Sequence, residues 1–170
     1  HLAIQQLLST YLLSDMSVVD FGGGLGGTWI NHQGLFTTTN KYAVIEQPCF
    51  VQEGRSIANE YDLPIAFYES IEELNFSPDI LIFSGVLSYL PDFKKIVNSA
   101  LKLSPALIIV DRQALSPASD PSRSWWLQYD ENYYGKPLSY PIQLMPLSEL
   151  ISIFKAYTCV KKWRNDFDAL

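Results

Sequence analysis

The chain has 170 residues, which is about the size of one domain. Apolar residues make up 48% of it and charged residues 18%, so it can bury a continuous core and is not a disordered protein. With 12 Lys and Arg against 18 Asp and Glu, its formal charge is −6. This charge argues against the basic surface with which proteins bind the phosphates of a nucleic-acid duplex. We therefore expect one globular domain over residues 1–170 that does not bind nucleic acid.

The two cysteines, Cys49 and Cys159, belong to no C-x-x-C motif and have no histidine beside them. The sequence therefore predicts neither a metal site nor a disulfide framework, and both thiols are expected to be small buried apolar side chains. No apolar run approaches the roughly 20 residues that span a bilayer, and the first nine residues lack the charged head and long apolar centre of a signal peptide. These features predict a cytoplasmic protein with no membrane contact.

Segments with helical and strand-like patterns alternate up to residue 111. In chain order, the patterns predict a helix over 2–14, strands over 17–21 and 41–45, a helix over 50–61, strands over 65–68 and 79–84, a helix over 93–103 and a strand over 106–111. Strands that alternate with helices favour a mostly parallel sheet with helices on both faces. The predicted fold class is therefore a doubly wound α/β fold.

The pattern changes after Arg112. Residues 114–146 contain five of the ten prolines and no clear period, which predicts a long excursion of the chain and not a second domain. Its aromatic side chains are expected to form the core of the excursion, with stacking on a sugar or covering of a site as the alternative. Residues 147–157 again have a helical pattern, and residues 158–163 have the pattern of a last strand.

The glycine-rich segment after the first predicted strand fits two kinds of cofactor turn. Gly22, Gly24 and Gly27 match the G-x-G-x-x-G turn of dinucleotide-binding proteins. The D-x-G-x-G-x-G turn of enzymes that use S-adenosylmethionine (SAM) is matched as well, with Asp20 as its first residue and Gly26 as its last. A carboxylate would repel a pyrophosphate at a helix start, whereas SAM brings an ammonium and a sulfonium. Asp20 therefore favours SAM.

Two further strand ends carry candidate cofactor residues. Glu46 follows the second predicted strand, where a carboxylate can accept both ribose hydroxyls of a nucleoside cofactor. Because SAM and a nicotinamide dinucleotide both contain such a ribose, Glu46 does not distinguish them. Ser84 and Gly85 end the strand in DILIFSGVLSYL, and their small size leaves room for the cofactor and an acceptor beside it.

The segments VVDFGGGLGGT, VIEQP, DILIFSGVLSYLPD and IIVDR, in this order, resemble class I SAM-dependent methyltransferases. Together with a YG…SYP stretch at 134–141, they resemble more narrowly the methyltransferases associated with bacterial surface-polysaccharide biosynthesis. The resemblance covers about residues 15–165. It implies a Rossmann-like sheet, SAM as the cofactor and methyl transfer to an oxygen of a sugar or related small molecule. In the usual class I sheet, the last two strands form a reversed hairpin. Here we expect the final strand of that hairpin to be missing or to be formed by residues 165–170.

The resemblance also assigns cofactor-binding roles to single residues. Asp20 and the glycine turn are matched to the methionyl end, the EQP segment to the ribose, and the residues at the end of the fourth predicted strand to a position under the cofactor. Glu69 is matched to the acidic residue that contacts the adenine amine, with a solvated side chain as the alternative. The full set is Asp20, Gly22, Gly23, Gly24, Glu46, Gln47, Glu69, Ser84 and Gly85.

His32 and Asp111 are the candidate catalytic residues. Each has a structural alternative, since His32 can be a helix-surface or capping residue and Asp111 can form an ion pair with its neighbour. The residues expected to bind the acceptor have hydrogen-bond donors on long or rigid side chains, and they are Tyr89, Arg112, Arg123, Tyr134 and Tyr140. Two other functions stay open, namely a nicotinamide-dependent oxidoreductase or epimerase and a non-catalytic binding protein on a methyltransferase fold.

Overall fold

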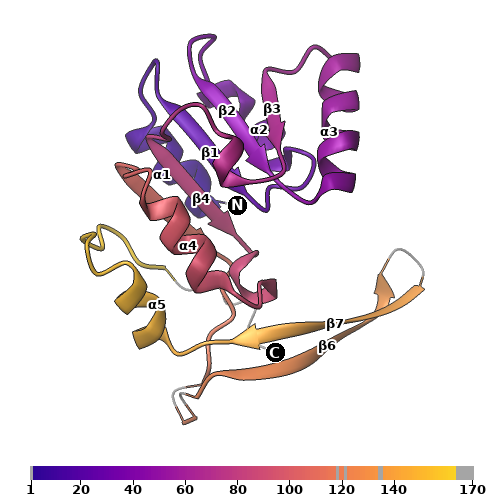
Figure 1. The fold of residues 1–170 in the computed structure, drawn as a ribbon, viewed down its shortest axis with the longest axis vertical. Helices are drawn as coiled ribbons and strands as arrows, with labels where there is room; N and C mark the ends of the chain where they lie inside the picture. Colours follow the sequence, from indigo (N-terminus) through magenta and orange to yellow (C-terminus); the bar gives the residue numbers. More distant parts are fainter. Residues whose placement is uncertain (1, 118, 121, 134–135, 164–170) are drawn as a thin grey trace. The chain divides into compact units, whose positions relative to one another are not determined.

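The computed structural model describes residues 2–117, 119–120, 122–133 and 136–163. These residues form two compact units (Figure 1). The first unit contains the chain up to Gly85 together with Ser99–Asp111. The second contains Val86–Asn98 together with the chain from Arg112 onward.

A five-stranded parallel sheet forms the centre of the first unit. Its strands are β1 (Ser17–Phe21), β2 (Lys41–Ile45), β3 (Ile65–Tyr68), β4 (Ile80–Ser84) and β5 (Leu107–Asp111). Their order in the sheet is β3-β2-β1-β4-β5, and every neighbouring pair is parallel. The strand order reverses between β1 and β4, which makes this a doubly wound sheet. The α/β fold expected from the alternating pattern is confirmed.

Burial follows the position of each strand in the sheet. The central strand β4 is buried at every residue, as the sequence ILIFS indicates for a strand covered on both faces. The edge strand β3 instead alternates, with Ile65 and Phe67 buried and Ala66 exposed. The core of the first unit therefore lies along β1, β2 and β4.

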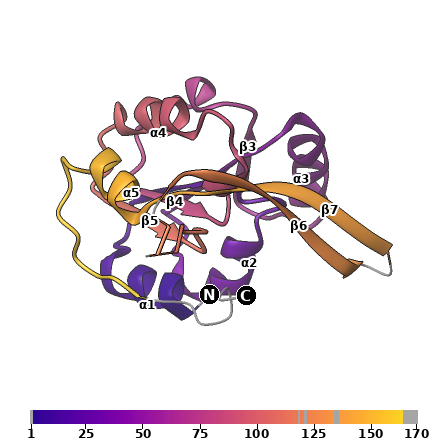
Figure 2. The same ribbon diagram turned by 90° about the horizontal axis from the view of Figure 1, so that it is seen from below.

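Three helices of the first unit flank the sheet, namely α1 (Leu2–Tyr11), α2 (Gly27–His32) and α3 (Pro48–Glu60). Figure 2 shows α1 and α2 on the same side of the sheet. Helix α3 approaches β3 so closely that a Cβ atom on Gly54 would lie 2.4 Å from the Phe67 ring. Of helix α4 (Phe93–Leu101), the residues up to Asn98 are assigned to the second unit and the last three to the first. None of the described helices combines the length and apolar character needed to cross a bilayer.

The second unit contains the Pro- and aromatic-rich excursion. Most of it forms an antiparallel two-stranded ribbon of β6 (Ser124–Tyr133) and β7 (Lys136–Leu144), followed by helix α5 (Leu147–Ile153). The expectation that its aromatic side chains form a core is wrong for Trp125, Trp126 and Tyr129, which are 48%, 59% and 62% exposed. A two-stranded ribbon has two faces, and an excursion of this length does not supply a second layer to cover them.

Two further expectations from the sequence are wrong. Residues 158–163 do not form a strand, and the described part of the five-stranded sheet ends at β5. Residues 165–170, the alternative final strand, lie outside the described residues. Cys49 and Cys159 are both exposed instead of buried. Cys49 follows the first residue of α3 on a solvent-facing turn, where burial does not decide the residue type.

Candidate functional site

The predicted cofactor residues of the first unit gather at the carboxyl edge of the five-stranded sheet. The register pairs Phe21 with both Ile45 and Phe83, so β1, β2 and β4 end at the same level. The glycine turn, Glu46 and Ser84 follow these positions directly in the chain. In open α/β sheets, ligands bind at this edge near the point where the strand order reverses.

The turn after β1 has a backbone that favours glycine. Gly22, Gly24 and Gly26 have φ angles of 74°, 57° and 87°, in the left-handed region that side chains with a Cβ rarely adopt. The Gly22 amide donates to the Ile45 carbonyl oxygen at 2.8 Å, which ties the turn to the end of β2. A Cβ atom on Gly24 would meet no protein atom within 4 Å, so this part of the turn faces open space.

Asp20 lies directly beneath this turn. Its side chain is 1% exposed, and a Cβ atom on Gly23 would lie 2.7 Å from both Cγ and Oδ2 of the carboxylate. Real Cβ contacts are not this short, so residue 23 must be glycine for the turn to close over Asp20. The motif spacing D-x-G-G-G thus corresponds to a physical contact between its first residue and its middle glycine.

Tyr42 is a site residue that the sequence reasoning missed. Its hydroxyl donates to Asp20 Oδ2 at 2.9 Å, and the tyrosine is 3% exposed. Burial, and then the negative charge of Asp20, raises the pKa of Tyr42 well above its usual value of 10. The phenol therefore keeps its proton and holds the carboxylate. The only sequence signal was a tyrosine directly before the apolar run of β2, and the strand register was needed to pair it with Asp20.

Glu46 and Gln47 extend β2 at the same edge. The Glu46 amide donates to the Tyr68 carbonyl oxygen at 3.0 Å, and the Gln47 amide donates to the Glu46 carboxylate. Glu46 is half-buried, with its carboxylate held at the start of α3. Glu69 follows β3 at this edge and is exposed, and its amide donates to Glu73 Oε2 at 3.2 Å. The assignment of Glu69 to an adenine amine stays a prediction.

Ser84 and Asp111 are brought together by the pairing of β4 with β5. The Ser84 hydroxyl lies 3.5 Å from Asp111 Oδ2, and both residues are buried. The Gly85 amide donates to the Asp111 carbonyl oxygen at 2.9 Å, with Gly85 at a φ of 67°. Arg112 is exposed and has a φ of 51°, which is unusual for a residue with a Cβ. The catalytic role of Asp111 and the acceptor-binding role of Arg112 stay predictions.

His32 is the last residue of α2, a helix that leads away from the glycine turn. It is 9% exposed, which rules out the helix-surface alternative, and no described residue forms a hydrogen bond with its Nε2 atom. Burial lowers the pKa of His32, so the imidazole is neutral at pH 7. Among the described residues, no three His, Cys, Asp or Glu side chains gather in a way that could hold a metal ion.

The predicted acceptor-binding residues Tyr89 and Tyr140 meet within the second unit. Their ring centroids are 5.6 Å apart, and the Tyr89 hydroxyl lies 3.5 Å from Gln128 Oε1 on β6. Tyr89 ends a 3-10 turn, η3 (Leu87–Tyr89), that lies beside β7. Tyr134, a third predicted acceptor residue, lies outside the described residues.

Arg123 belongs to an ion-pair cluster in the second unit. It donates to both carboxylate oxygens of Glu149, and the Lys94 ammonium lies 2.6 Å from Glu149 Oε1. The Arg123 guanidinium also lies 4.8 Å from the centre of the Phe93 ring. Burial by itself would raise the pKa of Glu149, but the two cations outweigh it and the pKa is lowered. Arg123 therefore joins the start of β6 to α4 and α5, and its role toward an acceptor stays a prediction.

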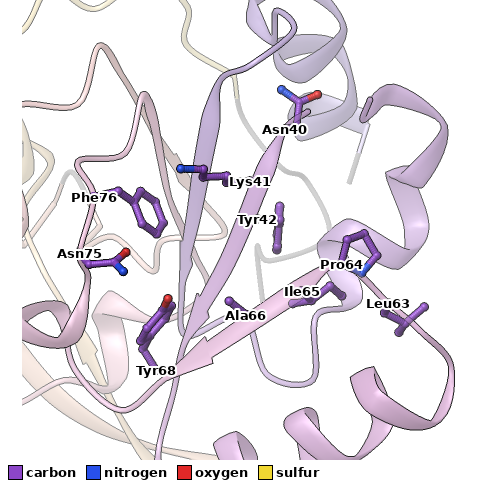
Figure 3. A pocket seen from close by; sticks show the side chains of 10 residues that line it. All are labelled: Asn40, Lys41, Tyr42, Leu63, Pro64, Ile65, Ala66, Tyr68, Asn75 and Phe76. Carbon is purple, nitrogen blue, oxygen red and sulfur yellow. The ribbon is translucent and has the colours of Figure 1, made fainter. Parts of the chain in front are cut away.

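A hollow of about 430 Å³ lies at the β3 edge of the sheet. Figure 3 shows its lining, which consists of Asn40, Lys41, Tyr42, Leu63, Pro64, Ile65, Ala66, Tyr68, Asn75 and Phe76. It contains none of the residues that the sequence assigns to a cofactor or an acceptor. The carboxyl edge of the sheet is the stronger candidate site, because the glycine turn and the buried carboxylate are there.

No family model and no curated protein sequence matches this chain. Solved structures do resemble it. The N-terminal domain of EvdMO1, solved in the presence of S-adenosylhomocysteine (SAH) and D-fucose, gives a TM-score of 0.61 at 8% sequence identity. The match covers 92% of this chain and 72% of the EvdMO1 chain.

Two further neighbours have a similar likeness. The sugar N-methyltransferase KedS8 from Streptoalloteichus gives a TM-score of 0.61 at 12% identity, covering 91% of this chain and 76% of KedS8. An S-adenosylmethionine-dependent methyltransferase from Clostridium acetobutylicum gives 0.57 at 14% identity, covering 90% and 76%. The likeness is one of fold. This chain has the Rossmann-like α/β fold that these three structures share, two of which are methyltransferases.

Proposed function

We propose that this protein is a SAM-dependent methyltransferase that methylates an oxygen of a small acceptor, a sugar or a related metabolite. The fold shared with methyltransferases supports the reaction class. The acceptor class is supported by two neighbours, one of which is a sugar N-methyltransferase and one of which was solved with D-fucose. The resemblance of the five sequence segments to methyltransferases of surface-polysaccharide biosynthesis agrees with such an acceptor.

The observation that carries the proposal is the buried Asp20 carboxylate beneath the glycine turn. Gly23 packs directly on this carboxylate, and Tyr42 donates a hydrogen bond to it. A negative charge at this depth acts through little solvent, so it disfavours an anionic pyrophosphate on the turn and favours a cationic ligand. SAM carries an ammonium and a sulfonium, whereas a nicotinamide dinucleotide carries two phosphates.

The other edge residues fit the same cofactor. Gly24 has no Cβ and faces open space, so a ligand can lie against the turn there. Glu46 follows the last residue of β2, whose carbonyl oxygen accepts from the turn, and has the two oxygens needed to accept both hydroxyls of a ribose. Ser84 and Gly85 end the neighbouring strand with small side chains. We assign the ribose to Glu46 and Gln47 and the methionyl end to Asp20 and the turn.

When bound, SAM would supply a methyl carbon to which an acceptor oxygen forms a bond while the C–S bond breaks and its electron pair leaves with the sulfur. The protein lowers the barrier mainly by orienting the reactants, which can contribute about 7–11 kcal/mol in well-oriented cases. The acceptor hydroxyl must give its proton to a base, and we assign that role to Asp111. Its carboxylate lies at the carboxyl edge beside Ser84, whereas His32 ends a helix that leads away from it. Tyr89 and Tyr140 are the proposed acceptor contacts.

Calorimetry with SAH and NAD in separate titrations tests the cofactor. SAH should bind and NAD should not, and each of Asp20→Asn and Glu46→Gln should weaken SAH by about 1–3 kcal/mol, the range for hydrogen bonds to charged groups. Glu60→Gln, at the exposed end of α3, is the matched control and should bind SAH like the original protein. NAD binding with no response to SAH would overturn the proposal, and unchanged affinity in both edge variants would move the cofactor site elsewhere.

A further inference from the structure

One face of the ribbon of β6 and β7 (Figure 1) carries only uncharged side chains from Ser124 as far as Gln128. Residues two positions apart in a strand point to the same face, and so do residues that are paired across two strands. We call this stretch the Trp126 face, and it consists of Ser124, Trp126 and Gln128 on β6 and their partners Leu144, Ile142 and Tyr140 on β7. Burial of a charge against such side chains is costly, so the face suits a neutral ligand.

Trp126 exposes its ring while its polar atom is already bonded. The indole Nε1 donates to Ser124 Oγ at 2.8 Å, and Trp126 is 59% exposed. Because Nε1–H is the only hydrogen-bond donor of a tryptophan side chain, the exposed part of Trp126 is the apolar ring. The hydrogen bond to Ser124 also limits the orientations of this ring. A ligand that stacks on a ring held in this way loses less of its affinity to the ordering of the side chain.

Gln128 places a polar group beside the ring. The Tyr89 hydroxyl lies 3.5 Å from Gln128 Oε1, so the Nε2 end of the amide is turned away from Tyr89. Gln128 is exposed, and none of the described residues accepts a hydrogen bond from its Nε2. Tyr140 lies directly opposite Gln128 in the register and is the diagonal neighbour of Trp126, a distance that aromatic side chains can bridge. The Trp126 ring, the Gln128 amide and the Tyr89–Tyr140 ring pair therefore lie together on one surface.

We propose that Trp126 and Gln128 determine the acceptor specificity by binding one neutral pyranose ring of the acceptor, together with Tyr89 and Tyr140. This inference rests on the proposed function, in which Tyr89 and Tyr140 contact the acceptor, and it adds the two residues that select the sugar. A pyranose has a face of C–H groups and a rim of hydroxyls. Its C–H face lies on the exposed Trp126 ring, and one of its hydroxyl oxygens accepts a hydrogen bond from Gln128 Nε2.

The opposite face of the ribbon lacks this combination. Trp125, Leu127 and Tyr129 alternate there and are 48%, 70% and 62% exposed. The middle residue of the three is aliphatic and has no flat ring on which a sugar can stack. No hydrogen bond to another described residue holds the Trp125 indole, in contrast to Trp126. Both faces expose apolar side chains, but only the Trp126 face joins a held ring to an amide that can donate to a hydroxyl.

Saturation-transfer-difference NMR without SAM measures sugar binding directly. The probes are the neutral sugars D-fucose, D-glucose and D-mannose, each compared with the uronate of the same ring configuration, in which C6 is a carboxylate. The original protein should transfer saturation to the ring C–H protons of at least one neutral sugar. The matching uronate should bind at least about tenfold more weakly, because its carboxylate would lie against the uncharged Trp126 face.

Two pairs of matched variants assign the binding to single residues. Trp126→Ala removes the ring and Gln128→Glu removes the amide donors at the same side-chain size, and each should raise the dissociation constant of the neutral sugar about tenfold. Trp125→Ala, on the opposite face, and Gln52→Glu, at an exposed position of α3, make the same changes and should bind like the original protein. Trp126→Phe keeps an aromatic ring and should bind more tightly than Trp126→Ala. Circular dichroism should show that every variant is folded.

Three results would each overturn the proposal. They are the absence of binding to all three neutral sugars, equal affinity for a neutral sugar and its uronate, and equal effects of Trp125→Ala and Trp126→Ala. In the first case, light scattering of the original protein shows whether a second copy covers the Trp126 face instead. The NMR experiment contains no SAM, so it is separate from the SAH calorimetry. SAH binding without sugar binding contradicts only the sugar site, whereas sugar binding without SAH binding contradicts only the methyltransferase proposal.

Discussion

Replacement of Tyr42 by Phe removes one hydroxyl from beneath the candidate site and leaves the ring in place. In the native protein this hydroxyl donates to Asp20 Oδ2 at 2.9 Å, and the two residues are 3% and 1% exposed. Hydrogen bonds to charged groups contribute about 1.5–3 kcal/mol, and little solvent is available to replace this one. We therefore expect Tyr42→Phe to lower the free energy of unfolding by about 1.5–3 kcal/mol. For a chain of this size that is a fall of about 3–12 °C in Tm.

Urea unfolding and thermal melting followed by circular dichroism measure this change. Tyr61→Phe is the control, since it removes the same hydroxyl from a tyrosine that is 64% exposed and should shift the free energy by less than about 0.5 kcal/mol. SAH affinity should fall in Tyr42→Phe as well, because Tyr42 positions the Asp20 carboxylate. Equal stabilities of the two variants would refute the reasoning, since they would mean that the buried hydrogen bond contributes nothing.

The pH dependence gives an independent measurement of the same contact. The pKa of Tyr42 is raised in the native state, so the unfolded chain loses the phenolic proton first as the pH rises. The contribution of Tyr42 to stability is therefore complete below about pH 10, the unfolded value, and falls as the pH increases beyond it. The difference between the original protein and Tyr42→Phe should shrink above pH 10. A constant difference up to pH 11, about one pH unit higher, would contradict the cause assigned to the raised pKa.

Two further predictions concern packing and a buried histidine. Gly54→Ala should lower the free energy of unfolding by about 1–3 kcal/mol, because the added Cβ would lie 2.4 Å from the Phe67 ring. Gly34→Ala is the control, since its Cβ would meet no atom within 4 Å, and it should leave the free energy of unfolding almost unchanged in the same urea titration. The lowered pKa of His32 stabilises the native state above the unfolded value of about 6.5, and this contribution is lost as the pH falls. The free energy of unfolding should then decrease below pH 6.5 by up to about 1.4 kcal/mol per pH unit. In His32→Gln this decrease should be less steep. The same decrease with pH in both proteins would contradict burial of His32 as its cause.

The sequence by itself determined the strand and helix pattern of the first unit. Buried parallel strands need continuous apolar runs such as ILIFS, and turns with positive φ need glycine, so both leave a local record in the chain. The alternation of these elements fixed the fold class. The glycine turn and Glu46 were found for the same reason, since residues at the carboxyl ends of parallel strands meet at one edge.

The tertiary structure decided what depends on contacts between distant segments. Tyr42 became a partner of Asp20 only through the register of β1 with β2, which no single strand encodes. The contact of Gly23 with the carboxylate likewise depends on the folded path of the turn.

The largest errors lay where local sequence does not determine burial. The aromatic side chains of β6 have the composition of a core, but an antiparallel ribbon buries them only if another layer covers them. Residues 158–163 have the pattern of a strand but do not form one, because a strand also needs a neighbour with which to pair. Hydrophobic pattern thus specifies which faces could be covered, and only the packing of the whole chain determines which of them are.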